Sequence, residues 1–560
     1  MKHYLDILNK KRLWIIIYIL LGIVLALLNS FSASYFQKVL DDFGDNTLSI
    51  TTLCIYGIVL VLVCGLNYFD EYPSSKLSQS IYLDFKLKAL RKMSTLDYKY
   101  YQSLGTGNLV QKIENGASAG KSIIFDFYFR LFRELLPSIF FSLIFISSID
   151  KNIMIYIAIG YVFVFGITNI LLKYLYKVKE RILNNEEIFN KYLIRGFMEL
   201  VVFRTNRRFE YEIDKATNAS QEIVNSKTKM KMIHEAFFGI FALFITVITI
   251  FIGWKSNSLT VGSVVALLTL IDKAYSPIAI FNVLFVQCKL DKSAFERYLD
   301  LLNMPDDVQL NSGKIMNSID GNISFKNVYF SYDDKNIFKD LSFDIPAGTS
   351  VAVVGESGCG KSTIVKQIIG LLKTDAGNIY VDGNDLSEIN LNNFYNYVSY
   401  TSQESPIFDG TLRENIVFDK DISDDKIVEA LKHVGLKQFY FSLPKGLDTE
   451  VGERGVMLSG GERQRLALTR VFFNDSKIVI LDEATSAMDN VTEELVMKNI
   501  MQFLKNKTII TIAHRLNTIK DFKKIYVFKE GEIIGEGGFK ELLDHNQYFQ
   551  RLWNATLENC

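Results

Sequence analysis

The 560-residue sequence has few cysteines and no excess of charge of either sign. Its 62 basic and 62 acidic side chains balance, so nothing indicates a nucleic-acid partner or a polyelectrolyte tail. The mean hydropathy of +0.15 is high for a soluble protein, and the apolar residues concentrate before about residue 300. The five cysteines have neither disulfide-like nor zinc-like spacing and are predicted to be free thiols: Cys54, Cys64, Cys288, Cys359 and Cys560.

The apolar runs in the first half predict six membrane spans. A bilayer core of about 30 Å is crossed by roughly 20 apolar helical residues. Several runs of this length carry no charge, and the last is broken only by Asp272 and Lys273. A cleaved signal peptide is a poorer interpretation of the first run, because that run is too long and five further spans follow. The predicted spans lie at about 13–37, 50–72, 130–149, 153–176, 236–254 and 259–288.

The positions of the basic residues predict the orientation in the membrane. Lysine and arginine precede the first span and are frequent in the long connections at about 73–130 and 173–235. Because such residues gather in cytoplasmic loops, both termini are predicted to be cytoplasmic. The two long connections favour helices that reach into the cytoplasm. We therefore expect a multi-pass protein of a cell membrane, a bacterial inner membrane or a plasma membrane.

Asp272 places a charge inside the sixth predicted span. It lies about ten residues from the start of that span, hence roughly 15 Å into the bilayer. A charge at that depth is costly unless it faces protein or water. Asp272 is therefore predicted to line a substrate cavity or to form an ion pair between helices.

The second half of the chain has the pattern of an α/β domain. The transmembrane domain is expected to cover residues 1–302, and a linker to cover 303–320. Strand and helix patterns alternate over 321–560. The sequence therefore predicts a helical membrane domain followed by an α/β domain.

A glycine-rich loop, GESGCGKST, follows the apolar strand SVAVV and precedes a helix. This strand–loop–helix context is that of a phosphate-binding loop, and a glycine-rich turn without a ligand explains it less well. The glycines let backbone N–H groups approach phosphates, Lys361 reaches the β- and γ-oxygens, and Ser362 coordinates Mg²⁺. The predicted nucleotide-binding residues are Gly355, Glu356, Ser357, Gly358, Cys359, Gly360, Lys361, Ser362 and Thr363.

An acidic pair ends a second apolar strand. In KIVILDEATSAMD, four apolar residues precede Asp482 and Glu483. The carboxylate of Asp482 suits Mg²⁺ binding, and that of Glu483 could polarise a water for attack on a γ-phosphate. Such a pair is weak evidence alone, because buried strands often end in solvated acids, but together with the phosphate loop it indicates nucleotide hydrolysis.

The stretch LSGGERQR, residues 458–465, together with the two preceding motifs, resembles the signature of ATP-binding cassette (ABC) proteins. The resemblance covers about 320–550 and is specific, because several motifs occur in the order of the family. It implies an α-helical transmembrane domain of six spans followed by an α/β P-loop ATP-binding cassette domain. It also implies ATP and Mg²⁺ as ligands.

The same resemblance assigns roles to residues outside the phosphate loop. Tyr332 stands where an aromatic ring stacks on adenine, and Gln403 matches the glutamine that senses the γ-phosphate and Mg²⁺. Asp489 matches the loop after the catalytic strand, which we call the D-loop (Thr485–Asp489), and His514 matches the switch histidine. Glu483, Gln403 and His514 are thereby expected to form the catalytic set.

In the family, two cassettes face each other head to tail. ATP then lies between the phosphate loop of one cassette and Ser459, Gly460 and Gly461 of the other. The serine hydroxyl and the glycine N–H groups add donors for the phosphates that exist only when the dimer closes. Since the chain has one cassette, the resemblance implies a second identical chain, a lipid bilayer and a transported substrate as partners, and no nucleic acid.

The stretch TEVGERG, residues 449–455, resembles one that is found in exporters and absent from importers. The fusion of six spans to one cassette also resembles an exporter half-transporter. In that resemblance, residues 97–109 and 204–212 lie at the two coupling helices. The expected activity is an ATPase coupled to outward transport, that is, a translocase.

Three alternatives stay open at this point. The chain could be half of a heterodimer, a lipid flippase, or, in another class of function, a cassette that gates a channel or serves as a subunit without transport. The intact Glu483, Gln403, Ser459 and His514 favour turnover over a regulatory role. The substrate is open between a bacteriocin-like peptide, a drug and a lipid, with peptide or drug export preferred.

Overall fold

The computed structural model describes residues 2–104, 106–254, 260–333, 335–452, 458–513 and 515–558. The chain divides into two compact units, which we call the helical unit (Met1–Ser94 and Leu104–Met304) and the cassette unit (Thr95–Ser103 and Pro305–Cys560). The short stretch Thr95–Ser103 thus groups with the cassette unit although it lies between two long helices in the sequence.

The helical unit consists of long helices. Asp150 begins α7 by accepting hydrogen bonds from the backbone of Asn152 and Ile153, and the Thr260 hydroxyl begins α10 in the same way. The described helices are α1 (Lys2–Lys10), α2 (Arg12–Gly44), α3 (Ile50–Thr95), α5 (Thr106–Lys121), the π-helical segments η1 (Ser122–Phe129) and η2 (Leu131–Leu135), α6 (Leu136–Ile149), α7 (Lys151–Met198), α8 (Leu200–Thr205), α9 (Phe209–Trp254) and α10 (Val261–Asn303).

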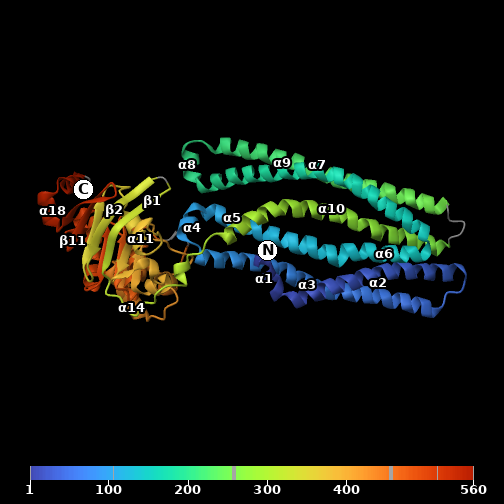
Figure 1. Ribbon diagram of the computed structural model, residues 1–560, viewed down its shortest axis with the longest axis horizontal. Coiled ribbons are helices and arrows are strands. Elements are labelled where there is room, and N and C mark those ends of the chain that lie inside the picture. The colour runs from blue at the N-terminus through green and yellow to red at the C-terminus, as the bar shows by residue number, and fades with distance from the viewer. Residues whose placement is uncertain are drawn as a thin grey trace. The chain divides into compact units, whose positions relative to one another are not determined.

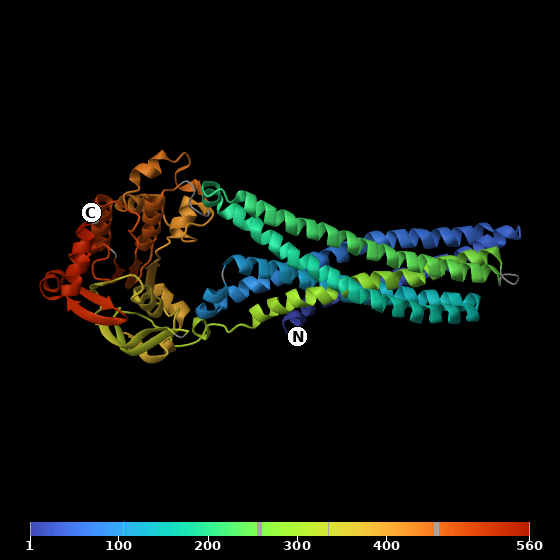
Figure 2. The ribbon, with the colours of Figure 1, turned by 90° about the horizontal axis from the view of Figure 1, so that it is seen from above.

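The long helices run alongside one another in a bundle (Figures 1 and 2). The helix α10 packs against α2, α5 and α6, and α7 packs against α9 along much of its length. Apolar clusters lie between these helices, among them one around Phe85 and Tyr298 and another around Leu270 and Tyr275. Tyr298 and Tyr275 each donate their hydroxyl proton to a backbone carbonyl, so both rings are buried without a lost hydrogen bond.

Four of the described helical stretches are long and apolar enough to cross a membrane: Arg12–Gly44, Ile50–Thr95, Leu109–Ile149 and Val261–Asn303. They contain the predicted first, second and third spans, and the predicted sixth span from Val261 onward; residue 259 of that span lies outside the described residues. The predicted spans at 153–176 and 236–254 lie within α7 and α9, and the count of six stays a prediction.

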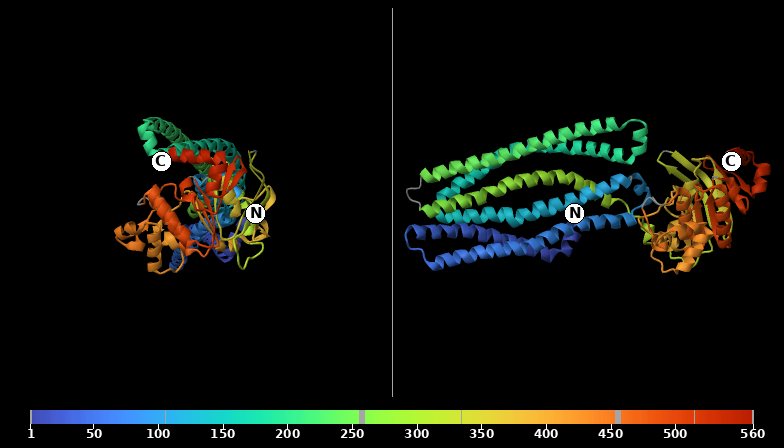
Figure 3. Two further views of the ribbon diagram at one scale, coloured as in Figure 1. Left: turned by 90° about the vertical axis from the view of Figure 1, so that its left-hand side faces the viewer. Right: turned by 180° about the vertical axis from the view of Figure 1, so that it is seen from behind.

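The cassette unit contains two main sheets (Figure 3, right). The six-stranded sheet has the order β12-β11-β3-β10-β9-β6 and is parallel except for β12; the four-stranded antiparallel sheet has the order β2-β1-β4-β5. The strands are β1 (Ile323–Tyr332), β2 (Lys335–Ile345), β3 (Ser350–Gly355), β4 (Ala376–Val381), β5 (Asn384–Asp385), β6 (Val398–Thr401), β7 (Gly410–Thr411), β8 (Glu450–Val451), β9 (Ile478–Asp482), β10 (Thr508–Ile512), β11 (Lys524–Lys529) and β12 (Glu532–Gly537).

The parallel strands β9 and β10 are buried at every residue, which explains their isoleucine-rich sequences. One core cluster lies between the two sheets, and a second lies beneath the helices that precede and follow the signature. The predicted α/β domain is therefore confirmed. Its helices are α4 (Tyr98–Leu104), α11 (Lys361–Ile368), α12 (Leu391–Phe394), α13 (Leu412–Val417), α14 (Asp424–His433), α15 (Lys437–Ser442), α16 (Gly460–Thr469), α17 (Asn490–Phe503), α18 (Phe539–His545) and α19 (Gln547–Glu558).

Candidate nucleotide-binding site

The glycine-rich loop joins β3 to α11, as the sequence predicts. Gly358 and Gly360 have φ angles of +82° and +90°, a left-handed conformation that favours glycine. A Cβ on Gly360 would also lie 2.8 Å from the ring of Phe338. The loop therefore needs these glycines to bring its backbone N–H groups to the start of α11, where an anion is stabilised.

Lys361 lies in this loop with only 7% of its surface exposed. Its ammonium donates hydrogen bonds to the carbonyl oxygens of Gly355 (2.9 Å) and Glu356 (3.3 Å). Glu356 and Ser357 are exposed, whereas Cys359 and Thr363 are buried and Ser362 is half-buried. The ammonium of Lys361 is thus folded against the backbone of its own loop.

Asp482 ends β9 and is 4% exposed. Its Oδ2 accepts a hydrogen bond from the Tyr400 hydroxyl at 3.4 Å, while its Oδ1 is buried and has no hydrogen-bond partner among the described residues. Burial raises the pKa of this carboxyl, and the neighbouring charge of Glu483 raises it further. A buried carboxylate oxygen without a partner, next to the phosphate loop, fits a divalent cation.

Glu483 follows at the end of the same strand with a φ angle of +50°, which is uncommon for a residue other than glycine. Its Oε2 accepts a hydrogen bond from Nε2 of Gln403 at 2.6 Å. Gln403 follows β6, which pairs in parallel with β9. The structure therefore brings Gln403 to the acidic pair Asp482 and Glu483, although Gln403 lies 80 positions from Glu483 in the sequence.

Tyr332 is half-buried at the end of β1, where its ring packs at 4.9 Å from that of Phe330. It contacts the core cluster between the two sheets. Its predicted contact with adenine stays a prediction. His514 lies outside the described residues, as do residues 453–455 of the predicted exporter stretch.

The signature serine, Ser459, begins α16 through a capping box. Its hydroxyl accepts from the Glu462 backbone N–H, and the Glu462 carboxylate accepts from the Ser459 backbone N–H at 2.7 Å. In the described part of the chain, no hydrogen bond joins Ser459, Gly460 or Gly461 to the phosphate loop. The signature contacts the D-loop instead, through Gln464. The Gln464 side-chain amide donates a hydrogen bond to the Ser486 hydroxyl and accepts one from the Ala487 backbone N–H.

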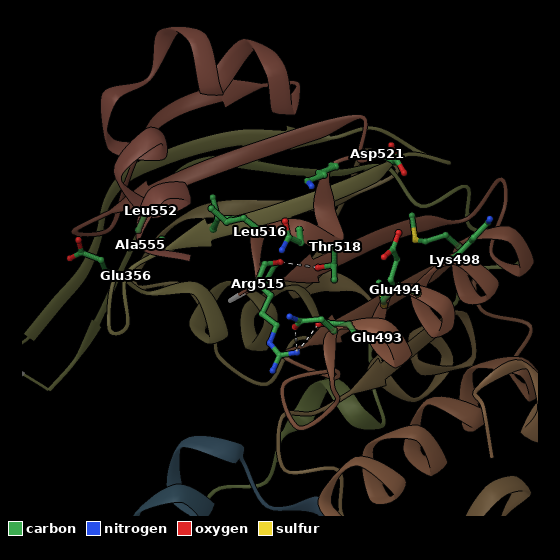
Figure 4. A pocket seen from close by; sticks show the side chains of 18 of the residues that line it. Glu356, Glu493, Glu494, Lys498, Arg515, Leu516, Thr518, Asp521, Leu552 and Ala555 are labelled. Atoms are coloured by element: carbon green, nitrogen blue, oxygen red, sulfur yellow. Dashed lines mark hydrogen bonds and ion pairs between the residues drawn. The ribbon is translucent and has the colours of Figure 1, made fainter. Parts of the chain in front are cut away.

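Sequence reasoning missed Arg515 and Glu493, which hold the D-loop; the Thr485 hydroxyl donates to the Glu493 carboxylate. Arg515 donates to the carbonyl oxygens of Met488 (2.7 Å) and Ser486 (3.3 Å) and to the buried carboxylate of Glu493 (2.9 Å). Figure 4 shows Arg515 and Glu493 pointing toward one another on the wall of a cavity of about 1140 Å³ that also reaches the phosphate loop at Glu356. The only sequence signal was position, because Arg515 directly follows the predicted switch histidine.

The predicted cavity residue, Asp272, lies in α10 and is exposed. It lines a cavity of about 450 Å³ inside the helical unit. Its role in substrate binding stays a prediction.

Comparisons with known proteins agree with this geometry. The family model described as "ABC transporter" matches residues 338–486, and that described as "ABC transporter transmembrane region" matches residues 15–274. The chain is 30% identical over 542 residues to the uncharacterized ABC transporter ATP-binding protein YwjA of Bacillus subtilis, over 93% of this chain and 92% of that protein. It is 27% identical over 596 residues to the putative multidrug export ATP-binding/permease protein YgaD of the same organism, over 100% of this chain and 99% of that protein.

A solved structure has the same fold. It is that of a bacterial Atm1-family ABC exporter with ATP bound, with a TM-score of 0.81 and 23% identity, over 98% of this chain and 100% of that chain. A transmembrane region and an ABC ATPase domain therefore lie in one chain, in the organisation of an exporter half-transporter. The chain belongs to the ABC transporter family, and it is a membrane protein with an ATP-binding ATPase domain.

Proposed function

We propose that two copies of this chain form an ATP-driven exporter that works by alternating access, with both termini cytoplasmic in a cell membrane. The observation that carries the proposal is the acidic pair at the end of β9: Asp482 has a buried oxygen without a described partner, and Glu483 is held by Gln403. A site that only binds nucleotide does not need an oriented carboxylate beside the cation ligand, whereas hydrolysis does.

Each residue has a definite part in this proposal. Lys361 and the backbone of its loop bind the β- and γ-phosphates, and Ser362, Gln403 and Asp482 hold Mg²⁺, which supplies charge neutralisation when bound. Glu483 accepts a proton from the attacking water, and Gln403 holds the carboxylate of Glu483 in position. His514 is proposed to contact the γ-phosphate end, and Tyr332 to stack on adenine.

The second copy completes each site. Ser459 and the N–H groups of Gly460 and Gly461 lie at the start of α16, where backbone donors favour an anion. Among the described residues, no hydrogen bond joins these groups to the phosphate loop of their own chain. We therefore propose that they contact the phosphates of the ATP bound by the opposite copy. The transported substrate is proposed to be a peptide or a drug, and the name of YgaD, a putative multidrug export protein, supports the drug alternative.

The purified full chain, reconstituted alone in liposomes, tests this proposal. We expect a dimer by native mass spectrometry, Mg²⁺-dependent ATPase activity, and ATP-dependent movement of a fluorescent peptide or drug. A monomer without ATPase activity would favour a heterodimer. ATPase activity coupled only to movement of a fluorescent phospholipid would identify a lipid flippase, and gating of ion flux without transport would indicate a regulator.

A further inference from the structure

The cavity of about 450 Å³ in the helical unit has a polar wall although it lies among predicted membrane spans. It is formed by α2, α3, η2 with α6, and α10. Its volume is in the range of small-molecule sites. Four charged side chains line it: Arg133, Glu134, Asp272 and Lys273. Charges in a membrane segment are costly and mark functional sites, so the partner of each one is informative.

Arg133 is already neutralised by the protein. Its guanidinium forms an ion pair with Asp70, and both side chains are largely buried. The guanidinium carbon also lies 4.0 Å from the ring centroid of Tyr18, a cation–π contact. Gly22 leaves room for the side chain of Arg133, because a Cβ at position 22 would lie 1.8 Å from Cγ of Arg133. No ligand anion is needed to balance this charge.

Two further charges also have protein partners. Glu134 accepts a hydrogen bond from Nε of Arg130 at 2.9 Å, one helical turn away. The ammonium of Lys273 donates to the backbone carbonyl of Asn29 at 2.6 Å, which ties α10 to α2. Lys273 is therefore directed toward α2 by its own hydrogen bond.

Asp272 differs from the other three. In the part of the chain that the structure describes, its carboxylate has no hydrogen bond and no ion pair, and it is exposed on the cavity wall. Its sequence neighbour Lys273 forms no ion pair with it and is held by Asn29. The cavity thus presents one anionic group whose hydrogen-bonding capacity is unused.

We infer that this cavity binds the protonated amine of the transported substrate through the carboxylate of Asp272. The inference rests on the proposed export function, and it names the substrate class: a molecule with an ammonium group beside an apolar body. A small amine and a peptide with a free amino terminus share this chemistry. A hydrogen bond between an ammonium and a carboxylate is stronger than one between neutral groups, so the ammonium of the substrate determines its affinity for the cavity.

Equilibrium binding to the nucleotide-free full chain in lipid nanodiscs tests the inference. The probes are dansylcadaverine, its neutral N-acetyl derivative, the anionic dansyl-aminocaproate, and the peptide Gly-Gly-Lys with dansyl on its lysine and a free amino terminus. Fluorescence titration is expected to give about tenfold or more tighter binding of dansylcadaverine than of its acetyl derivative. Tight binding of the peptide would show that a peptide amine is accepted, and weak binding would restrict the site to small amines.

Variants separate a binding role from a structural one. Asp272→Asn is expected to remove the preference for the amine, Asp272→Glu to retain it, and Asp272→Lys to reverse it toward dansyl-aminocaproate. Glu134→Gln is the matched control, because that carboxylate lines the same cavity but already has Arg130 as a partner; it should keep the preference. Retained ATP binding shows that each variant is folded.

Equal affinity for the amine and its acetyl derivative in the unmodified chain would overturn the inference, as would an unchanged preference in Asp272→Asn and Asp272→Lys together. These results are independent of the proposed export function, because binding is measured without nucleotide. Failure of export itself appears separately, as an absence of ATP-dependent movement of every probe in liposomes.

Discussion

The amide of Gln403 donates a hydrogen bond to Oε2 of Glu483 over 2.6 Å, although the two residues are 80 positions apart. They meet because β6 and β9 pair in parallel, and parallel neighbours end at the same edge of a sheet. The hydrogen bond fixes the direction of the Glu483 carboxylate. A carboxylate that is oriented before the reaction is better placed to act as a general base.

Replacement of Glu483 by glutamine should stop hydrolysis and leave ATP binding intact. The amide keeps the size of the side chain but cannot accept a proton, so we expect the ATPase rate to fall by about 100-fold or more. The measurements are ATPase rate and retained nucleotide in the purified full chain. Glu494→Gln is the control, since Glu494 is an exposed carboxylate on α17. Near wild-type hydrolysis by Glu483→Gln would show that another group acts as the base.

Replacement of Arg515 by alanine should release the D-loop. The change removes donors to the carbonyls of Met488 and Ser486 and leaves the buried Glu493 carboxylate without this cation. We expect the cassette to lose about 1–3 kcal/mol of unfolding free energy and ATPase activity to fall more than ATP binding. Thermal unfolding, nucleotide binding and ATPase rate measure the three effects.

Two variants make the Arg515 result specific. Arg515→Lys keeps the charge but lacks the fork that bonds two carbonyls and a carboxylate together, so it should recover stability better than activity. Lys498→Ala removes an exposed cation from the same cavity wall and should change neither. If Arg515→Ala lost ATP binding and ATPase activity in equal proportion, the arginine would serve the fold of the cassette alone.

The charge of Asp482 should destabilise the protein when Mg²⁺ is absent. Burial raises the pKa of Asp482 above the ordinary value of 3.8. Between that value and the raised pKa, the folded carboxyl therefore holds a proton that the unfolded carboxyl has already lost. Its contribution to stability therefore falls as the pH rises from about 3.8 through the raised pKa. In EDTA at neutral pH, Asp482→Asn should unfold at a higher temperature than the unmodified protein.

The difference in unfolding temperature between Asp482→Asn and the unmodified protein should shrink as the pH is lowered, because the carboxyl then becomes neutral in both states. Added Mg²⁺ with ATP should stabilise the unmodified protein more than Asp482→Asn, since the variant lacks the carboxylate that we propose as the cation ligand. A pH-independent difference would show that packing, not charge, separates the two proteins.

The phosphate loop and the acidic strand end could be predicted because local sequence determines them. Gly358 and Gly360 stand where positive φ angles are needed, and the apolar run before Asp482 is the fully buried strand β9. The place of Gln403 in the site came only from family resemblance, and its hydrogen bond to Glu483 was not predicted, because strand order decides that contact and no local pattern shows strand order. The hydrogen bonds from Arg515 to the D-loop were missed because their acceptors are mainly backbone carbonyls, and every residue has such a carbonyl whatever its side chain.

The polar wall in the helical unit shows the same limit. Asp272 could be singled out, because a charge in an apolar run is visible in the sequence. The partners of Arg133 could not be predicted, since Asp70, Tyr18 and Gly22 lie on two other helices. The association of Thr95–Ser103 with the cassette unit was also hidden, because it depends on pairing between Leu96 and Asp306 across the chain.

The thiol of Cys359 provides a chemical test of the phosphate loop. Burial raises the pKa of this thiol above its ordinary value of 9.0, and the nearby Lys361 ammonium offsets only part of that effect. The thiolate is the reactive form, so inhibition of the ATPase by N-ethylmaleimide should be slow at neutral pH and accelerate as the pH rises toward and beyond the ordinary value.

Prebound MgATP should protect the Cys359 thiol from N-ethylmaleimide, because the phosphates would occupy the loop that holds the thiol. Cys359→Ser should resist inhibition at every pH, although the thiols of Cys54 and Cys64 remain exposed in that variant. Inhibition of Cys359→Ser at the unmodified rate would place the sensitive thiol elsewhere in the chain.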